Sequence, residues 1–323
     1  MEQPILDVRN LSIDYPISIG TVEAVRDVSF SLGVGESLGF VGESGCGKST
    51  LGLSLLQLLR PPGRIVGGEI LYHGKDILKG SEEDMRKLRG ENIAMVFQNP
   101  LTSLDPLFSI EDQFFETLKE HDSKITRKEA VERAGKVLED LSIDKDRLYE
   151  YPHQLSGGMR QRIMIGLGLI LNPDLLIADE PTTSLDVIVE AGFIDLLARL
   201  KKEYNISLIL ISHNLGLVAE IADRIAVMYG GKLMEIGNAE DIFAMPMHPY
   251  TEGLIGCVPN IKMDQEKLVS MPGSPPDLVN PPRGCRFSPR CPKVMDICKE
   301  KEPELKTHKD GRQVACWIHD EVN

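Results

Sequence analysis

The residues from Gly42 to Thr50 have the types and spacing of a phosphate-binding loop. They fit G-x-x-x-x-G-K-[ST], in which glycines let the backbone curl so that its N–H groups point at phosphate oxygens. Lys48 can reach the β- and γ-phosphates of a nucleotide, and the Ser49 hydroxyl can ligate Mg²⁺. A glycine-rich turn would match this pattern by accident on the order of once in a hundred sequences. We therefore predict a nucleotide site here.

A second set of chemical groups follows the apolar run 175–178, which is predicted to be a buried strand ending at Asp179 and Glu180. Carboxylates at the carboxyl end of a parallel strand lie in the ligand crevice of an open α/β sheet. Asp179 could hold Mg²⁺ through its waters, and Glu180 could polarise an attacking water, an effect worth about two to four decades in rate. The alternative is an acidic strand end that is merely solvated.

A third candidate is the helix start at Ser156-Gly157-Gly158. A serine N-cap followed by bare glycine amides makes a second anion site at a helix terminus. Alone this signal is weak, because serine and glycine commonly cap helices.

Strands and helices are expected to alternate along the chain around these groups. A buried strand at 37–41 precedes the phosphate-binding loop and a helix at 50–59 follows it. Tyr15-Pro16 is predicted to lie in a loop between two strands, and residues 110–168 are predicted to be mainly helical. Further strands are predicted at 5–12, 22–32, 66–72, 94–97, 174–178, 207–211, 224–228 and 232–236, and helices at 187–204 and 215–222. Alternation of this kind favours a doubly wound parallel sheet.

Composition narrows the class of protein. The chain has 323 residues, 42% of them hydrophobic, and a formal charge of −13 from 36 basic and 49 acidic side chains. An acidic chain argues against broad nucleic-acid binding, which needs a basic surface to replace counterions. The longest apolar run, 163–171, is about half of a membrane span. The first residues show neither the basic start nor the apolar stretch of a secretory signal, so we expect a cytoplasmic protein.

Taken together with Gln98, Ser184-Leu185-Asp186 and Ser212-His213, these motifs closely resemble the ATP-binding cassette (ABC) family over residues 1 to about 240. The resemblance implies an α/β fold with a P-loop NTPase (RecA-like) core, an antiparallel β subdomain, and a helical subdomain at about 101–168. It also implies a head-to-tail dimer that holds two ATP molecules, pairing either with itself or with a similar ATPase chain. The cassette is expected to span 1–245.

The resemblance implies a role for each matching residue. Catalysis would involve Glu180, His213 and Gln98, while Mg²⁺ would be held by Ser49, Gln98 and Asp179. ATP would contact Tyr15, Ser44, Gly45, Cys46, Gly47, Lys48, Ser49, Thr50, Ser156, Gly157, Gly158 and Asp186. Seen alone, Tyr15 is more often a packing residue than a base-stacking one, and Gln98 and His213 would be ordinary polar loop residues. Met159 stands where many members of the family carry glutamine.

The last part of the chain, 246–323, is similar to the extension of dipeptide and oligopeptide importer ATPases, in particular the D-type dipeptide-permease ATPases. The similarity rests on His248 to Thr251, Gly273 to Leu278 and Gly284 to Pro292. It implies two transmembrane permease partners, an indirect extracytoplasmic peptide-binding protein, and a place at the cytoplasmic face of the cell membrane. The helical insert would dock the permeases.

Four cysteines crowd into this extension with spacing C-x₅-C-x₆-C-x₁₇-C, namely Cys285, Cys291, Cys298 and Cys316. Disulfides are disfavoured in a reducing cytoplasm, so a metal site is favoured. Four thiolates could hold a 4Fe–4S cluster, hold zinc, or remain free, because the spacing matches neither common zinc modules nor a ferredoxin run. The resemblance favours a cluster with a structural role.

Three other functions compete with peptide import. One is an ABC ATPase not involved in transport that acts on ribosomes, DNA or cluster assembly; the acidic charge and the single cassette argue against it. Another is a degenerate, non-hydrolysing cassette, which the intact Lys48, Asp179, Glu180 and His213 oppose. An importer of another solute, such as nickel, would carry the same ATPase motifs.

Overall fold

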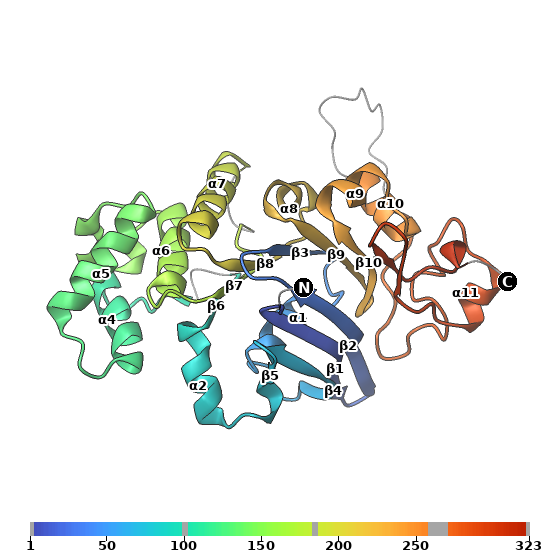
Figure 1. The fold of residues 1–323 in the computed structure, drawn as a ribbon, viewed down its shortest axis with the longest axis horizontal. Coiled ribbons are helices and arrows are strands. Elements are labelled where there is room, and N and C mark those ends of the chain that lie inside the picture. Colours follow the sequence, from blue (N-terminus) through green and yellow to red (C-terminus); the bar gives the residue numbers. More distant parts are fainter. Residues whose placement is uncertain (1–2, 99–102, 183–186, 258–270, 321–323) are drawn as a thin grey trace. The chain divides into compact units, whose positions relative to one another are not determined.

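The structure, a computed structural model, describes residues 3–98, 103–182, 187–257 and 271–320 (Figure 1). The chain forms two compact units. Unit 1 comprises Met1–Gly33, Ser37–Lys79 and Ile211–Asn323, and unit 2 comprises Val34–Glu36 and Gly80–Leu210. The phosphate-binding loop and the C-terminal extension therefore belong to the same unit.

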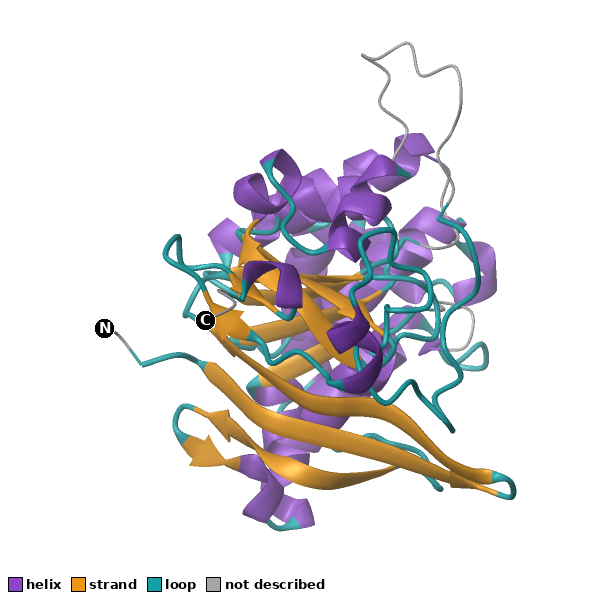
Figure 2. Cartoon of the chain, turned by 90° about the vertical axis from the view of Figure 1, so that its right-hand side faces the viewer, coloured by secondary structure: helices purple, strands orange, loops and turns teal. Residues whose placement is uncertain are grey.

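Unit 1 contains two groups of strands. The first is an antiparallel sheet of four strands in the order β2-β1-β4-β5, whose long strands lie side by side in Figure 2. The second group runs β11-β12-β10-β9-β3. The bounds are β1 (Leu6–Ile17), β2 (Gly20–Leu32), β3 (Ser37–Val41), β4 (Arg64–Tyr72), β5 (Lys75–Asp76), β9 (Arg224–Tyr229), β10 (Lys232–Asn238), β11 (Lys306–Thr307) and β12 (Gln313–Val314).

Strand β3 is buried along its whole length and pairs in parallel with β9. Burial of both faces explains why Leu38, Phe40 and Val41 are all apolar. Its first residue, Ser37, is polar but satisfied, because its hydroxyl donates to Asp223 Oδ2 (2.6 Å) and its N–H donates to the same oxygen (2.8 Å). This anchoring fixes the register of the strand that delivers the phosphate-binding loop.

The hairpin between β9 and β10 turns at Gly230 and Gly231, whose φ angles are 55° and 82°. A two-residue turn that follows the strand twist requires positive φ at both positions, which glycine adopts at little cost. The glycine pair therefore permits the tight hairpin that joins β9 to β10.

The helices of unit 1 are short. They are α1 (Lys48–Leu55), α8 (Leu215–Ile221), α9 (Ala239–Ala244), α10 (Pro249–Gly256) and α11 (Asp296–Glu300). The C-terminal extension supplies the last two, and its strand β12 pairs antiparallel with β10 through Glu235 and Ile236. Backbone hydrogen bonds therefore join the extension to the strands of unit 1.

Unit 2 carries the strands β6 (Ile93–Val96), β7 (Leu175–Asp179) and all of β8 (Ser207–Ile211) except its last residue, in the order β8-β7-β6. β6 and β7 run parallel. The helices are α2 (Glu82–Glu91), α4 (Ile110–His121), α5 (Arg127–Asp140), α6 (Gly157–Leu169) and α7 (Val187–Glu203). α5 begins at a capping box, in which Thr126 and Glu129 satisfy each other's backbone N–H groups. The predicted helical character of 110–168 is confirmed.

Two local predictions are wrong. Tyr15 and Pro16 lie inside β1 rather than in a loop, because β1 continues to Ile17 and pairs with β2 beyond them. The helix after the phosphate-binding loop ends at Leu55 instead of residue 59, because Gln57 adopts a left-handed φ of 51° that a helix cannot continue through. Among the described residues, no helix has the length and apolarity that crossing a membrane requires.

Candidate nucleotide site

The phosphate-binding loop connects the end of β3 to the start of α1 in unit 1. Gly47 is the N-cap of α1 and has φ 103°, and a Cβ added there would lie 2.3 Å from the carbonyl oxygen of Ala24. Both the backbone conformation and the space therefore require glycine. The following amides stand at a helix N-terminus, where the helix dipole and free N–H groups favour an anion.

Lys48 is 4% exposed, and its ammonium group is held by the loop itself. Nζ donates to the carbonyl oxygens of Gly42 (2.7 Å) and Glu43 (3.1 Å) and lies 3.7 Å from Cys46 Sγ. Burial raises the pKa of the Cys46 thiol, so this cysteine is a neutral packing group. The lysine charge is thus poised beside the loop amides, where a phosphate would be bound.

The second group of candidate residues lies in unit 2 at the ends of β6 and β7. Gln98 Nε2 donates to Glu180 Oε2 at 2.7 Å, so the structure brings these two predicted residues together. Asp179, the last residue of β7, is 6% exposed. Glu180 has φ 43°, which is uncommon for a residue with a Cβ and is typical of sites where strain is retained for function.

The Ser156 segment caps α6 as predicted. The Ser156 hydroxyl accepts a hydrogen bond from the Met159 N–H at 3.3 Å, as an N-cap does. A Cβ added at Gly157 would meet no atom within 4 Å. Local packing therefore leaves room for a side chain at Gly157 and does not by itself require glycine there.

The other residues predicted to contact ATP include Tyr15, His213 and Asp186. The ring of Tyr15 packs on Gly63, where an added Cβ would lie 2.4 Å from the ring. His213 is exposed and directly precedes Asn214, the N-cap of α8. Asp186 lies outside the described residues.

The four clustered cysteines all line one small cavity of unit 1, together with His248 and Phe287. Burial raises the pKa of Cys285 to about 12, and the nearby thiols add to the rise. Burial also raises the pKa of Cys316 to about 11. Within the described part of the chain, however, no three histidine, cysteine or acidic side chains are grouped closely enough to hold a metal ion. The structure therefore brings the four thiols to one cavity but does not group them closely enough to bind a metal ion.

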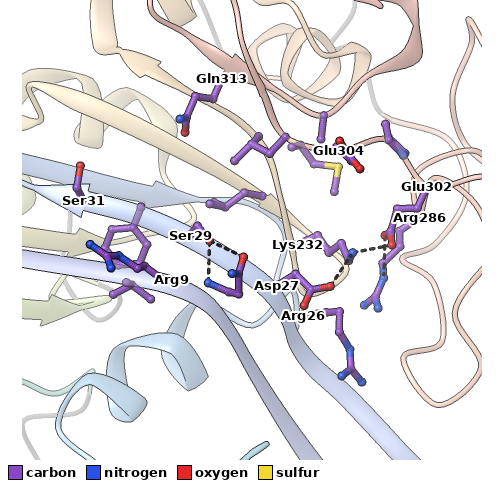
Figure 3. A pocket seen from close by; sticks show the side chains of 18 of the residues that line it. Arg9, Arg26, Asp27, Ser29, Ser31, Lys232, Arg286, Glu302, Glu304 and Gln313 are labelled. Carbon is purple, nitrogen blue, oxygen red and sulfur yellow. Dashed lines mark hydrogen bonds and ion pairs between the residues drawn. The ribbon is translucent and has the colours of Figure 1, made fainter. Parts of the chain in front are cut away.

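A larger cavity of about 580 Å³ lies elsewhere in unit 1 and is lined by β1, β2, β10 and the extension (Figure 3). Its cations face carboxylates: Lys232 Nζ lies 2.6 Å from Glu302 and 3.7 Å from Asp27. Because these charges already neutralise one another, we do not assign this cavity to a nucleotide.

Sequence reasoning missed the partners of Glu43, which the loop motif treats as a variable position. Its carboxylate pairs with Arg290 and its N–H donates to Tyr250, both in the extension. The motifs around these two residues were visible in the sequence, but nothing in a pattern shows a contact across 247 positions.

Comparisons with known families agree along the chain. The family described as ABC transporter matches residues 25–183, and the family described as oligopeptide/dipeptide transporter, C-terminal region, matches residues 234–298. The dipeptide transport ATP-binding protein DppD of Bacillus subtilis is 45% identical over 99% of this chain and 96% of its own length. The oligopeptide transport ATP-binding protein OppD of Escherichia coli is 45% identical, with 97% and 93% covered.

Solved structures show the same fold. CbiO1 from Clostridium perfringens, part of the ABC transporter complex CbiONQ, aligns with a TM-score of 0.65 and 30% identity over 76% of this chain and 92% of its own. A dimeric ATP-binding cassette bound to ADP and phosphate aligns with a TM-score of 0.65 and 23% identity over 72% and 98%. The predicted P-loop NTPase fold is confirmed.

Proposed function

This chain belongs to the ABC transporter family and hydrolyses ATP, and from that premise we propose that it energises the import of dipeptides or oligopeptides. The observation that carries the proposal is the match along nearly the whole chain to peptide-transport ATP-binding proteins, including the extension at 234–298. The partners are two transmembrane permeases and a second ATPase chain, served indirectly by an extracytoplasmic peptide-binding protein. The chain lies at the cytoplasmic face of the membrane.

In this proposal, the residues of the candidate site act on ATP. Lys48 binds the phosphates, and Tyr15 stacks on the adenine. Glu180 takes the proton of the attacking water and Gln98 orients that carboxylate, while His213 contacts the γ-phosphate. The hydrogen bond from Gln98 to Glu180 supports the pairing of these two roles. Mg²⁺, which prefers oxygen donors, would be held by Ser49, Gln98 and Asp179 and would neutralise phosphate charge.

A transport experiment tests the function. Cells lacking the chain should lose growth on a dipeptide supplied as the sole source of a required amino acid, and the gene for the chain should restore it. Nickel uptake and ribosome function should not change in the same cells. Normal growth on the dipeptide, together with a defect in one of these other processes, would overturn the proposal. Recovery of the tagged chain with integral membrane proteins from detergent extracts provides an independent check.

The Gly157→Ala variant separates the proposed signature contact from folding. An alanine at this first position of α6 meets no neighbour, and alanine stabilises helices relative to glycine. We expect unchanged or slightly higher thermal stability but ATP turnover lowered about tenfold or more, because the methyl group blocks close approach of the amide to the partner's γ-phosphate. The measurements are thermal melting and phosphate release. Unaltered turnover would remove Gly157 from the site.

We further propose that Cys285, Cys291, Cys298 and Cys316 hold a metal centre in the complete protein, a 4Fe–4S cluster in preference to zinc. One observation supports it: all four thiols line one cavity of unit 1. A thiolate-binding metal would stabilise the deprotonated forms that burial disfavours. Such a centre would clip together an extension too small to bury a core of its own.

Purification without oxygen tests this centre. We expect a brown protein with about four irons and four acid-labile sulfides per chain, and loss of the colour in the Cys285→Ser variant. One zinc and no iron per chain would show that the four cysteines hold zinc instead of a cluster. A full-length, folded sample with neither metal would overturn the proposal of a metal centre.

A further inference from the structure

We propose that Arg290 and Tyr250 of the C-terminal extension are positioning residues for ATP binding, which they support by holding Glu43 of the phosphate-binding loop. This role goes beyond the hydrolysis of ATP by the family fold, because it gives a residue outside the cassette motifs a part in shaping the nucleotide site. All three residues lie in unit 1.

Glu43 is held at two points by the extension. Arg290 forms a bidentate pair with its carboxylate, with Nη1–Oε2 at 2.8 Å and Nη2–Oε1 at 2.9 Å. The backbone N–H of Glu43 donates to the Tyr250 hydroxyl at 2.9 Å. A bidentate arginine–carboxylate pair fixes orientation as well as distance. The side chain and the backbone of one loop residue are therefore both constrained.

Arg290 is itself held rigidly. Its side chain is 6% exposed, its Nε donates to the Pro272 carbonyl at 2.8 Å, and its Nη1 donates to the Tyr229 hydroxyl at 3.2 Å. The guanidinium carbon lies 5.6 Å from the centre of the Tyr229 ring. A buried, multiply bonded guanidinium loses little further freedom when it grips a carboxylate. This ion pair is thus unlike an exposed surface pair, which contributes little.

Tyr250 is held by packing. It is fully buried, and its ring lies 4.6 Å from Tyr229 and 5.3 Å from Phe287, centre to centre. Aromatic pairs at these separations add to the stability that burial gives. The Tyr250 hydroxyl, which accepts the Glu43 N–H, is therefore held in place by aromatic packing between the start of α10, the end of β9 and Phe287.

The backbone carbonyl of Glu43 links this support to Lys48, the phosphate-binding lysine. That oxygen is one of the two main-chain acceptors of the Lys48 ammonium, at 3.1 Å. A displacement of Glu43 would therefore move an atom in direct contact with Lys48. Errors of about 1 Å in the placement of such groups are enough to weaken the contacts that a rigid site makes.

A second arginine of the same segment supports the other side of the loop. Arg286 donates to the carbonyl of Gly230 and to the Glu23 carboxylate, and it lies beside Glu302 in the large cavity (Figure 3). The neighbouring residue Gly231 donates its N–H to the carbonyl of Cys46 in the loop at 3.0 Å. The segment Cys285–Cys291 thus reaches the phosphate-binding loop by two routes.

The test is a double-mutant cycle on the full-length chain, with Glu43→Gln and Arg290→Gln made singly and together. Each single variant should raise the KM for Mg-ATP and the Kd for a fluorescent ATP analogue about five- to tenfold, with kcat changed less than twofold. The double variant should be no worse than Arg290→Gln alone, because both changes remove the same pair. Arg290→Lys should recover only part of the affinity, since an ammonium cannot bind bidentately.

The control is Lys306→Ala, which removes another carboxylate-paired cation of the extension, bonded to Asp320 at 2.7 Å. It should leave KM unchanged. A purely structural role for Arg290 would lower kcat through loss of folded protein, and melting curves report that loss. An unchanged KM in the folded Arg290→Gln and Glu43→Gln variants would overturn the proposal. Additive effects in the double variant would show that Arg290 does not act through Glu43, which overturns it as well.

Discussion

Replacing Glu180 by glutamine is expected to lower ATP turnover about 100- to 10,000-fold while ATP binding is retained. The amide cannot accept the proton of the attacking water, and general base catalysis contributes about that much. The amide oxygen can still accept the hydrogen bond that Gln98 donates to this side chain. The left-handed φ of 43° is equally available to glutamine, so the local backbone should not change.

The measurements are phosphate release at saturating Mg-ATP and the Kd for ATP. Glu132→Gln is the matched control, because it makes the same chemical change at an exposed position of α5. We also expect the Glu180→Gln chain to accumulate as an ATP-bound dimer in size-exclusion chromatography. Turnover at the normal rate would show that another group is the base, and loss of ATP binding would place Glu180 among the groups that hold the nucleotide.

The parts of the site that sequence could predict are those set by local rules. A strand buried on both faces must be apolar, a tight loop before a helix needs glycine, and Ser156 satisfies a backbone N–H of the helix that follows it. These rules act within a few residues. For this reason the strand 37–41, the glycine at Gly47 and the cap at Ser156 were all predictable.

The parts that sequence could not predict depend on contacts between distant residues or on strain. Tyr15 lies in a strand because β2 continues to pair beside it, although the Tyr-Pro pair favours a loop. The left-handed conformation of Glu180 has no local signal, since glutamate rarely adopts it. The pairing of Arg290 with Glu43 joins residues 247 positions apart. This ion pair forms because the extension, including α10, packs against β9.

Replacing Lys48 by methionine is expected to raise the Kd for ATP about 10- to 100-fold. A hydrogen bond to a charged group contributes about 1.5–3 kcal/mol, and about 1.4 kcal/mol corresponds to a tenfold change. The lysine side chain is 4% exposed, so methionine keeps the packing of its aliphatic stem and should not destabilise the fold. Calorimetric titration with Mg-ATP measures the change directly.

The matched control is Lys232→Met, which removes a half-buried lysine of the same unit that pairs with Glu302 in the large cavity. Both variants lose one cation and gain a thioether, so any general effect of charge on ATP affinity appears in both. We expect Lys232→Met to bind ATP as the unaltered chain does. If instead Lys232→Met loses affinity and Lys48→Met does not, the nucleotide occupies the large cavity rather than the phosphate-binding loop. The two possible locations of ATP, the phosphate-binding loop and the large cavity, predict opposite changes of affinity in these two variants. The pair therefore locates ATP on the chain without any assumption about transport.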